Sequence, residues 1–208
     1  FEDETKAGAT ITGNRYGIKA FTFNTGALSI TTTGETTGGT KDGIYAYNVE
    51  GTSLTINAAD TEGGTNGIRA RNSGTGALSI TTTGTTTGNG TDQFFVDGNK
   101  YSYYPAGIFA KNEGTGALSI TTTGKTTGAT DGISATNSST GTSLTINAAT
   151  TTGGRFGILA QNFGTGALSI TTSGKTTGTN RDGISAYNKE GTSLTINATD
   201  TEGGRNGI

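Results

Sequence analysis

The dipeptide Gly-Ile recurs along this chain at nearly constant spacing, and that periodicity limits the possible folds more than any other feature. Its glycines are Gly17, Gly43, Gly67, Gly107, Gly132, Gly157, Gly183 and Gly207. Six intervals are 24 to 26 residues long, and the interval after Gly67 is 40 residues. Such self-similarity indicates stacked copies of one supersecondary unit. We therefore treat residues 1–208 as one domain, with units starting near residues 17, 43, 67, 107, 132, 157 and 183 and an insertion at residues 92–105.

Within each unit the apolar residues alternate with polar ones. Leu28 and Ile30 flank Ser29, and Leu54 and Ile56 flank Thr55. A period of two is typical of strands that bury one face. Short strands separated by Gly, Asn and Thr turns, in units of about 25 residues, predict one coil of a parallel β-helix per unit.

The low apolar content agrees with such a stack and argues against one globular core. Leu, Ile, Val and Phe number 34 of 208 residues, whereas Gly numbers 37 and Thr 47. Each coil then buries only a thin slice of Ile, Leu, Ala and an inward Thr, and each large aliphatic residue contributes about 2 kcal/mol. Stability becomes a sum over interfaces between neighbouring coils.

Turn residues recur at fixed places in the unit. Paired glycines such as Gly63-Gly64 predict corners at which Gly supplies a positive φ. Acids precede Gly-Ile at Asp42, Asp131 and Asp182, where side-chain hydrogen bonds in turns are expected. An Asn column is expected to stack as a hydrogen-bonded ladder; its members are Asn48, Asn72, Asn112, Asn137, Asn162 and Asn188.

The units resemble the passenger region of bacterial autotransporters, the type V secreted proteins that include pertactin and self-associating adhesins. The resemblance is carried by Gly-Ile-x-Ala-x-Asn followed by Gly-Thr-Gly-Ala-Leu-Ser-Ile-Thr-Thr-Thr-Gly, at residues 67–84 and 107–124, and it covers about residues 10–208. It implies an all-β fold, a right-handed three-sided parallel β-helix of about seven coils, on a stalk exported to the cell surface. It also implies an upstream signal peptide and a downstream outer-membrane barrel, so we expect this chain to be a fragment of a longer passenger.

Two outward columns vary from unit to unit and supply candidate binding residues. Tyr and Phe lie amid Arg and Lys in these columns, as on many contact surfaces. The candidates are Tyr45, Tyr47, Arg69, Arg71, Phe109 and Lys111. Drift at unconstrained positions is the alternative explanation.

The insertion concentrates aromatic residues. Asp97-Gly98 between two β-prone runs predicts a hairpin turn, and Pro105, the single proline, closes the segment. The hairpin either binds a partner or packs on an apolar patch of the stalk, because Tyr and Phe serve both purposes. Its candidate binding residues are Phe94, Phe95, Tyr101, Tyr103 and Tyr104.

Composition limits the chemistry. The chain has no His and no Cys, so we expect no zinc site, no thiol nucleophile and no Ser-His-Asp triad. The acids are scattered, unlike those of polysaccharide lyases, so we expect neither catalysis nor a metal or cofactor. A net charge of −2 gives no basic footprint for nucleic acid.

Together with the variable outer columns and the aromatic insertion, the resemblance implies a non-catalytic adhesin or receptor-binding virulence factor outside the cell. Its expected partner is a host cell-surface or matrix protein or glycan. Self-association through Thr- and Asn-rich strands, or through the strand edges at either end, and a passive stalk are the alternatives. Ice binding by the Thr31-x-Thr33 pattern is weaker, because Asn57, Asn147 and Asn197 interrupt the array.

Overall fold

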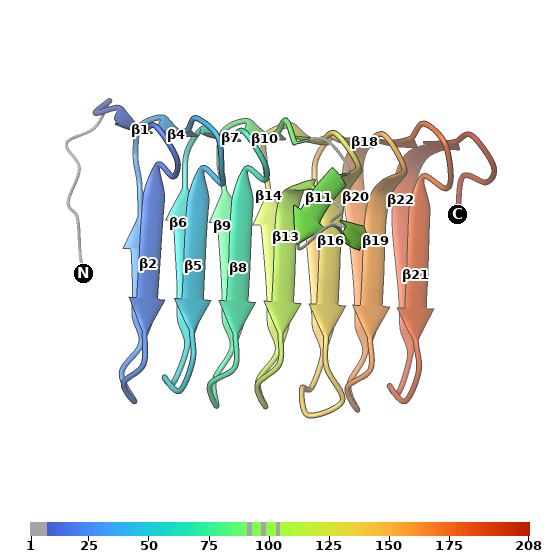
Figure 1. Ribbon diagram of the computed structural model, residues 1–208. Coiled ribbons are helices and arrows are strands. Elements are labelled where there is room, and N and C mark those ends of the chain that lie inside the picture. Colours follow the sequence, from blue (N-terminus) through green and yellow to red (C-terminus); the bar gives the residue numbers. More distant parts are fainter. Residues whose placement is uncertain (1–7, 91–92, 97–98, 103–104) are drawn as a thin grey trace.

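The computed structural model describes residues 8–90, 93–96, 99–102 and 105–208, and the side chains of residues 91–104 lie outside the description. The described residues form parallel strands that wind into a solenoid, with the first coil at one end of Figure 1 and the last at the other. The predicted parallel β-helix of about seven coils is confirmed, and no described residue lies in a helix. Accordingly, the described part holds no helix long and apolar enough to cross a membrane.

Each coil contributes strands to three columns. The first column is a seven-stranded sheet, and its strands stand side by side in Figure 1. Each strand begins at or next to a Gly-Ile pair. Its strands are β2 (Ile18–Thr22), β5 (Ile44–Asn48), β8 (Ile68–Asn72), β13 (Ala106–Asn112), β16 (Asp131–Asn137), β19 (Phe156–Asn162) and β21 (Ile184–Asn188).

The second and third columns belong to one 13-stranded sheet, because β20 and β22 run through the corner between them. The second column consists of β3 (Leu28–Thr31), β6 (Leu54–Ala58), β9 (Leu78–Thr82), β14 (Leu118–Thr122), β17 (Leu144–Ala148) and the first parts of β20 (Leu168–Gly178) and β22 (Leu194–Gly203). The third consists of β1 (Ile11–Gly13), β4 (Thr36–Gly38), β7 (Thr61–Gly63), β10 (Thr86–Gly88), β15 (Thr126–Gly128), β18 (Thr151–Gly153) and the later parts of β20 and β22.

The core lies inside the coils and repeats from one coil to the next. In the first column Ile44 stacks on Ile68, which stacks on Ile108, and all three side chains are fully buried. Leu and Ile do the same in the second column. Because parallel pairing is in register, like residues meet like residues, and each coil is both packed and hydrogen-bonded by its neighbours.

The corner glycines correct one expectation. Among the described glycines only Gly8 has a positive φ, at 86°, so the prediction that the paired glycines supply positive φ is wrong. Their role is to let backbone segments approach closely, both within the turn and between stacked coils. A Cβ at Gly63 would lie 1.7 Å from the carbonyl oxygen of Asn66, and one at Gly64 would lie 2.2 Å from that of Gly39.

Two side-chain columns tie the coils together. In the predicted Asn ladder, Asn48 Nδ2 donates to Asn72 Oδ1 at 2.6 Å, and the same bond repeats at each step to Asn188. The acids before Gly-Ile also accept hydrogen bonds, but from the next coil. Asp42 Oδ1 accepts from Asn66 Nδ2 at 2.6 Å, and fully buried Asp131 forms a two-pronged ion pair with Arg155.

The insertion after β10 contains the predicted hairpin strands. β11 (Gln93–Val96) pairs antiparallel with β12 (Asn99–Ser102), and the pair forms its own two-stranded sheet. The expected turn residues Asp97 and Gly98 lie outside the described residues. Where the chain rejoins the coil, the carbonyl of Pro105 accepts hydrogen bonds from the amides of Thr130 and Asp131.

Candidate functional site

The outer face of the first column gathers the aromatic and cationic residues predicted from the varying columns. Register places Lys19, Tyr45, Arg69 and Phe109 in one row across β2, β5, β8 and β13. A second row on the same strands holds Phe21, Tyr47, Arg71 and Lys111. We call these eight residues the aromatic–cationic face.

Aromatic rings pack against each other at the β2–β5 end of this face. The ring centroids of Phe21 and Tyr45 lie 5.0 Å apart in an edge-to-face arrangement, and those of Phe21 and Tyr47 lie 6.2 Å apart. Tyr16, in the corner before β2, stacks on Tyr45 at 5.8 Å. Such pairs contribute about 0.5–1.5 kcal/mol beyond burial. The rings are thus held in fixed orientations although they lie at the surface.

Cationic side chains cover these rings, Arg69 and Arg71 from the neighbouring coil and Lys19 from the same strand. The guanidinium of Arg69 lies 4.9 Å from the ring centroid of Tyr45, and that of Arg71 lies 4.9 Å from the ring of Tyr47. Lys19 Nζ lies 5.1 Å from the ring of Phe21. Each contact is a cation–π arrangement, so the face places positive charge directly against aromatic surface.

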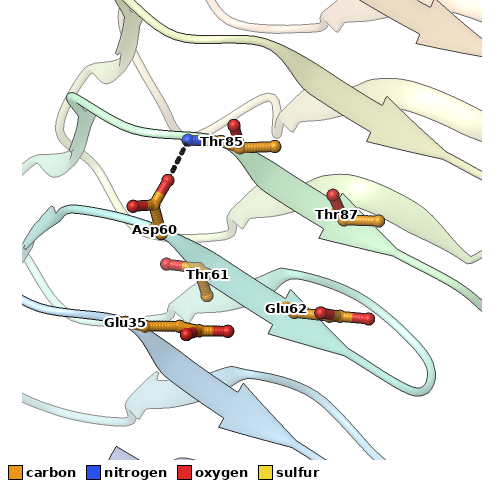
Figure 2. A pocket seen from close by; sticks show the side chains of 6 residues that line it. All are labelled: Glu35, Asp60, Thr61, Glu62, Thr85 and Thr87. Atoms are coloured by element: carbon orange, nitrogen blue, oxygen red, sulfur yellow. Dashed lines mark hydrogen bonds between the residues drawn. The ribbon is translucent and has the colours of Figure 1, made fainter. Parts of the chain in front are cut away.

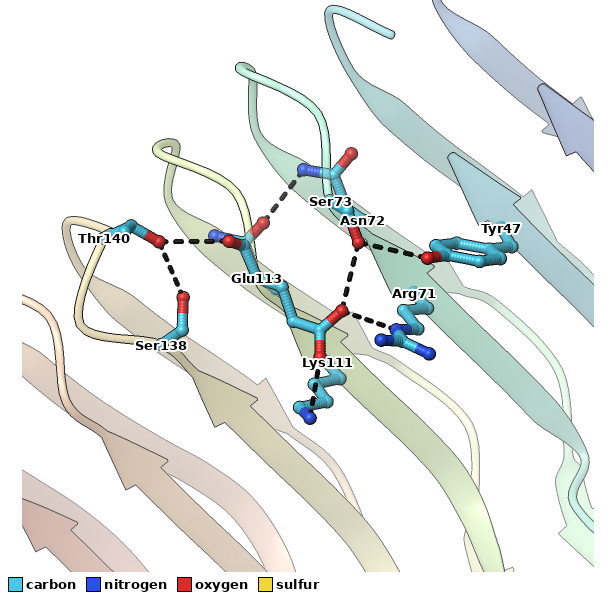
Figure 3. Close-up of polar contacts among 9 residues, drawn as sticks. Tyr47, Arg71, Asn72, Ser73, Lys111, Glu113, Ser138 and Thr140 are labelled. Atoms are coloured by element: carbon cyan, nitrogen blue, oxygen red, sulfur yellow. Dashed lines mark hydrogen bonds and ion pairs between the residues drawn. The ribbon is translucent and has the colours of Figure 1, made fainter. Parts of the chain in front are cut away.

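One carboxylate, Glu113, sits at the edge of the face and binds three of its neighbours (Figure 3). Arg71 Nε donates to Glu113 Oε2 at 2.5 Å, and Lys111 Nζ lies 2.7 Å from Oε1. Ser73 Oγ donates to Oε2 at 3.0 Å and also lies 3.4 Å from the hydroxyl of Tyr47. Partial burial alone would raise the pKa of Glu113, but the hydrogen bonds from Arg71, Lys111 and Ser73 outweigh it and lower the pKa to about 2.

The face ends after β13. The two rows continue over β16, β19 and β21 without charge, through Ser134, Leu159 and Ser185 and through Thr136, Gln161 and Tyr187. The alternation places Ser134 on the outer face, yet this residue is only 8% exposed. It lies between the longer side chains of Phe109 and Leu159 on the two neighbouring strands, which cover it. The predicted binding surface is therefore concentrated on the first four coils of the column.

A second arrangement lies on the third column, where a hollow of about 300 Å³ gathers acids that the sequence analysis treated as scattered (Figure 2). Glu35, Asp60 and Glu62 line it together with three threonines, which are Thr61, Thr85 and Thr87. Each carboxylate has a donor within the protein: Thr37 Oγ1 for Glu35, the Thr85 amide for Asp60 and Asn89 Nδ2 for Glu62. Within the described residues no group of three or more acids is arranged to hold a metal ion.

The remaining outer face, on the second column, is uncharged. Its strands present Ser or Thr in one row and Thr or Asn in the next, and Thr31, Asn57 and Thr81 are successive members of the second row. The interruption of the Thr array by Asn57, Asn147 and Asn197 is confirmed by the register.

The structure brings Tyr45, Tyr47, Arg69, Arg71, Phe109 and Lys111 together. Of the hairpin candidates, the side chains of Phe94, Phe95 and Tyr101 and all of Tyr103 and Tyr104 lie outside the description. The sequence analysis missed Glu113, Ser73 and Tyr16. Glu113 had a usable signal, because it lies just after β13 and two residues from Lys111, where a carboxylate can reach the neighbouring cations. Comparison with protein-family models, curated proteins and solved structures yields no match.

Proposed function

We propose that the chain is part of the stalk of a surface-exposed, autotransporter-type passenger that acts as a non-catalytic adhesin. Its partner is a component of a host cell surface or of the extracellular matrix. The observation that carries the proposal is the aromatic–cationic face. Its rings and cations lie on a rigid sheet, and contacts between neighbouring coils brace several of them. Preorganised aromatic and Arg side chains dominate the energy of many binding surfaces.

The fold supports this proposal through its rigidity. Every strand of the face is bonded on both sides to a neighbouring coil or ends the sheet, and the Asn ladder fixes the turn that follows. Little conformational entropy remains to be lost when a partner binds. The hairpin β11–β12, which is drawn in front of β13 and β16 in Figure 1, is the second candidate contact element.

Adhesion to immobilised matrix and to cultured cells tests the proposal. The face variant replaces Tyr45 and Tyr47 with Ser and Arg69 and Arg71 with Gln. The hairpin variant replaces Phe94, Phe95, Tyr101, Tyr103 and Tyr104 with Ser. Loss of binding in either folded variant supports adhesion through that element, and full binding by both would refute it.

Self-association is the second candidate, favoured by the uncharged face of the second column. Identical copies meet there without like-charge repulsion, and rows of hydroxyl and amide groups can hydrogen-bond to one another. Analytical ultracentrifugation tests this by comparing the chain with a Thr81→Lys/Thr121→Lys variant. Concentration-dependent oligomers that this variant abolishes would support the candidate, and a monomer throughout would reject it.

A further inference from the structure

The ion-pair cluster around Glu113 shows what this surface binds well. Its carboxylate is held by a guanidinium, an ammonium and a hydroxyl, from Arg71, Lys111 and Ser73. The side chains of Arg71 and Lys111 remain 42% and 40% exposed. A surface that already holds one carboxylate at three points is chemically suited to another.

We propose that the aromatic–cationic face binds an acidic polysaccharide through its carboxylates, with Glu113 standing where a ligand carboxylate would otherwise bind. This inference rests on the proposed binding function and names its ligand class. The other row adds further positive charge: Arg69 lies beside Arg71 on β8, and Lys19 lies on β2, two coils away. Positive charges thus lie at several points along the axis, as carboxylates of uronic acids do along a glycan.

Aromatic surface beside the charges fits the sugar rings. Phe21 and Phe23 are 36% and 67% exposed, and their rings lie 6.5 Å apart and 8° from parallel. The C–H groups of a pyranose carry partial positive charge and pack on the negative face of an aromatic ring. Phe21 also contacts Lys19, so one sugar can meet a ring and a cation together.

The shape of the surface favours an extended ligand. A hollow of about 420 Å³ starts at Lys111 and continues past Thr136, Ser138 and Phe163 to Lys189. It prolongs the face along the axis towards the last coil. A chain laid along both would make many weak contacts at once, which raises its total affinity.

Charge argues for a sparse polyanion over nucleic acid. Glu113 already neutralises part of Arg71 and Lys111, and the whole chain has a net charge of −2. DNA carries one charge per about 1.7 Å and is bound through many phosphate contacts. The four cations of the face lie on β2, β8 and β13, and this sparse positive charge matches the wider spacing of uronic acids better.

Isothermal titration calorimetry with defined oligomers tests the inference. The probes are a hyaluronan octasaccharide for carboxylates, a heparin octasaccharide for sulfates, maltooctaose as neutral glycan, and oligo-dT as nucleic acid. We expect the hyaluronan octasaccharide to bind at least about tenfold more tightly than maltooctaose or oligo-dT, as two charged hydrogen bonds would give. Binding of heparin without hyaluronan, equal binding of maltooctaose, or tighter binding of oligo-dT would each overturn the proposal.

Variants identify the surface. Arg69→Gln/Arg71→Gln should weaken hyaluronan binding about tenfold or more, since Gln stays polar but loses the charge and the bidentate guanidinium. Glu113→Gln should strengthen binding about threefold or more, because it releases Arg71 and Lys111. Lys175→Gln, on the third column, is the matched charge control and should change nothing. Weaker binding by Glu113→Gln, with unchanged circular dichroism, would contradict the assigned place of the carboxylate.

The outcomes separate this inference from the proposed function. A chain that adheres to cells or matrix but ignores both acidic octasaccharides would overturn the glycan assignment and leave adhesion standing. A chain that binds hyaluronan through the face but adheres to nothing would overturn adhesion and leave the ligand class standing.

Discussion

The side-chain amide of Asn72 donates a hydrogen bond of 2.9 Å to Oδ1 of Asn112, although the two residues are 40 positions apart and every other step of the ladder spans 24 to 26. The insertion therefore leaves the stack without disturbing its register. β8 and β13 pair residue for residue as closely as neighbouring coils elsewhere. The aromatic–cationic face can consequently run across the insertion, from Arg69 and Arg71 to Phe109 and Lys111.

Removing one member of the ladder should destabilise the whole stack. Asn112→Ala leaves Asn72 Nδ2, Asn137 Oδ1 and the Gly116 carbonyl without their partner. Each buried group left unsatisfied costs about 1–3 kcal/mol, so we expect a loss of about 2–4 kcal/mol in the free energy of unfolding. Urea denaturation measures it. Asn147→Ala, at an exposed position of β17, is the matched control, and an equal effect of both would show that the ladder is dispensable.

Replacing the glycine of a Gly-Ile pair by alanine should lower the stability of the fold. A Cβ at Gly107 would lie 2.7 Å from Thr126 Cγ2 and 2.8 Å from the carbonyl oxygens of Gly132 and Thr127. Overpacking of this kind costs about 1–3 kcal/mol. Thermal unfolding should show a lower Tm for Gly107→Ala, whereas Gly26→Ala, where nothing lies within 4 Å, should leave Tm unchanged. Adding Thr126→Ser removes the methyl group and should restore part of the loss; no restoration would contradict the packing explanation.

The ion pairs of Glu113 should make the free energy of unfolding depend on pH. Its pKa is about 2 in the folded chain against an ordinary 4.5, so its ion pairs stabilise the fold above pH 4.5 and are lost as the pH falls towards 2. Glu113→Gln should therefore lower the free energy of unfolding by on the order of 1–2 kcal/mol at pH 7 and by much less at pH 2, after allowance for solvent screening. Chemical denaturation at both pH values measures the difference. Glu50→Gln, at an exposed turn, is the control, and a Glu113 effect independent of pH would refute the linkage.

Asp42 should behave in the opposite way. Burial raises its pKa above the ordinary 3.8, and this outweighs its hydrogen bonds from Asn66. A raised acid pKa means that the fold is penalised as the pH rises through it, so Asp42→Asn should stabilise the chain at pH 7, by on the order of 1 kcal/mol, and not below pH 3.8. The acceptor oxygen for Asn66 is retained. Asp182→Asn, which has the same type of bond to Asn206 at a half-exposed site, is the comparison. Destabilisation by Asp42→Asn at pH 7 would contradict the argument.

The repeat made most of the fold predictable. Alternation and the Gly-Ile spacing indicate which residues point inward, and the Asn column indicates its own ladder, because stacking puts equal positions in contact. The repeat alone could not predict which unlike side chains come into contact across neighbouring coils. The bond of Asp42 to Asn66 and the gathering of Glu35 with Asp60 and Glu62 depend on which coil follows which.

The candidate site was predictable in outline for the same reason. Tyr45, Arg69 and Phe109 share a phase of the repeat, so their row follows from the register. Glu113 lies in a turn column whose other members include Ser73 and Phe163, and its part in the site depends on the reach of Arg71 and Lys111. The role of the corner glycines was mistaken because their sequence signal is the same for a positive φ and for a close backbone approach.

The most direct test of the central claim locates the ligand on the molecule. NMR spectra of the arginine Nε–Hε groups are recorded during titration with the hyaluronan octasaccharide. The signals of Arg69 and Arg71 should shift in a saturable way, whereas that of Arg155, held by buried Asp131, should stay in place. Saturable shifts that spare Arg69 and Arg71 would contradict the claim that the outer face of the first column is the binding surface.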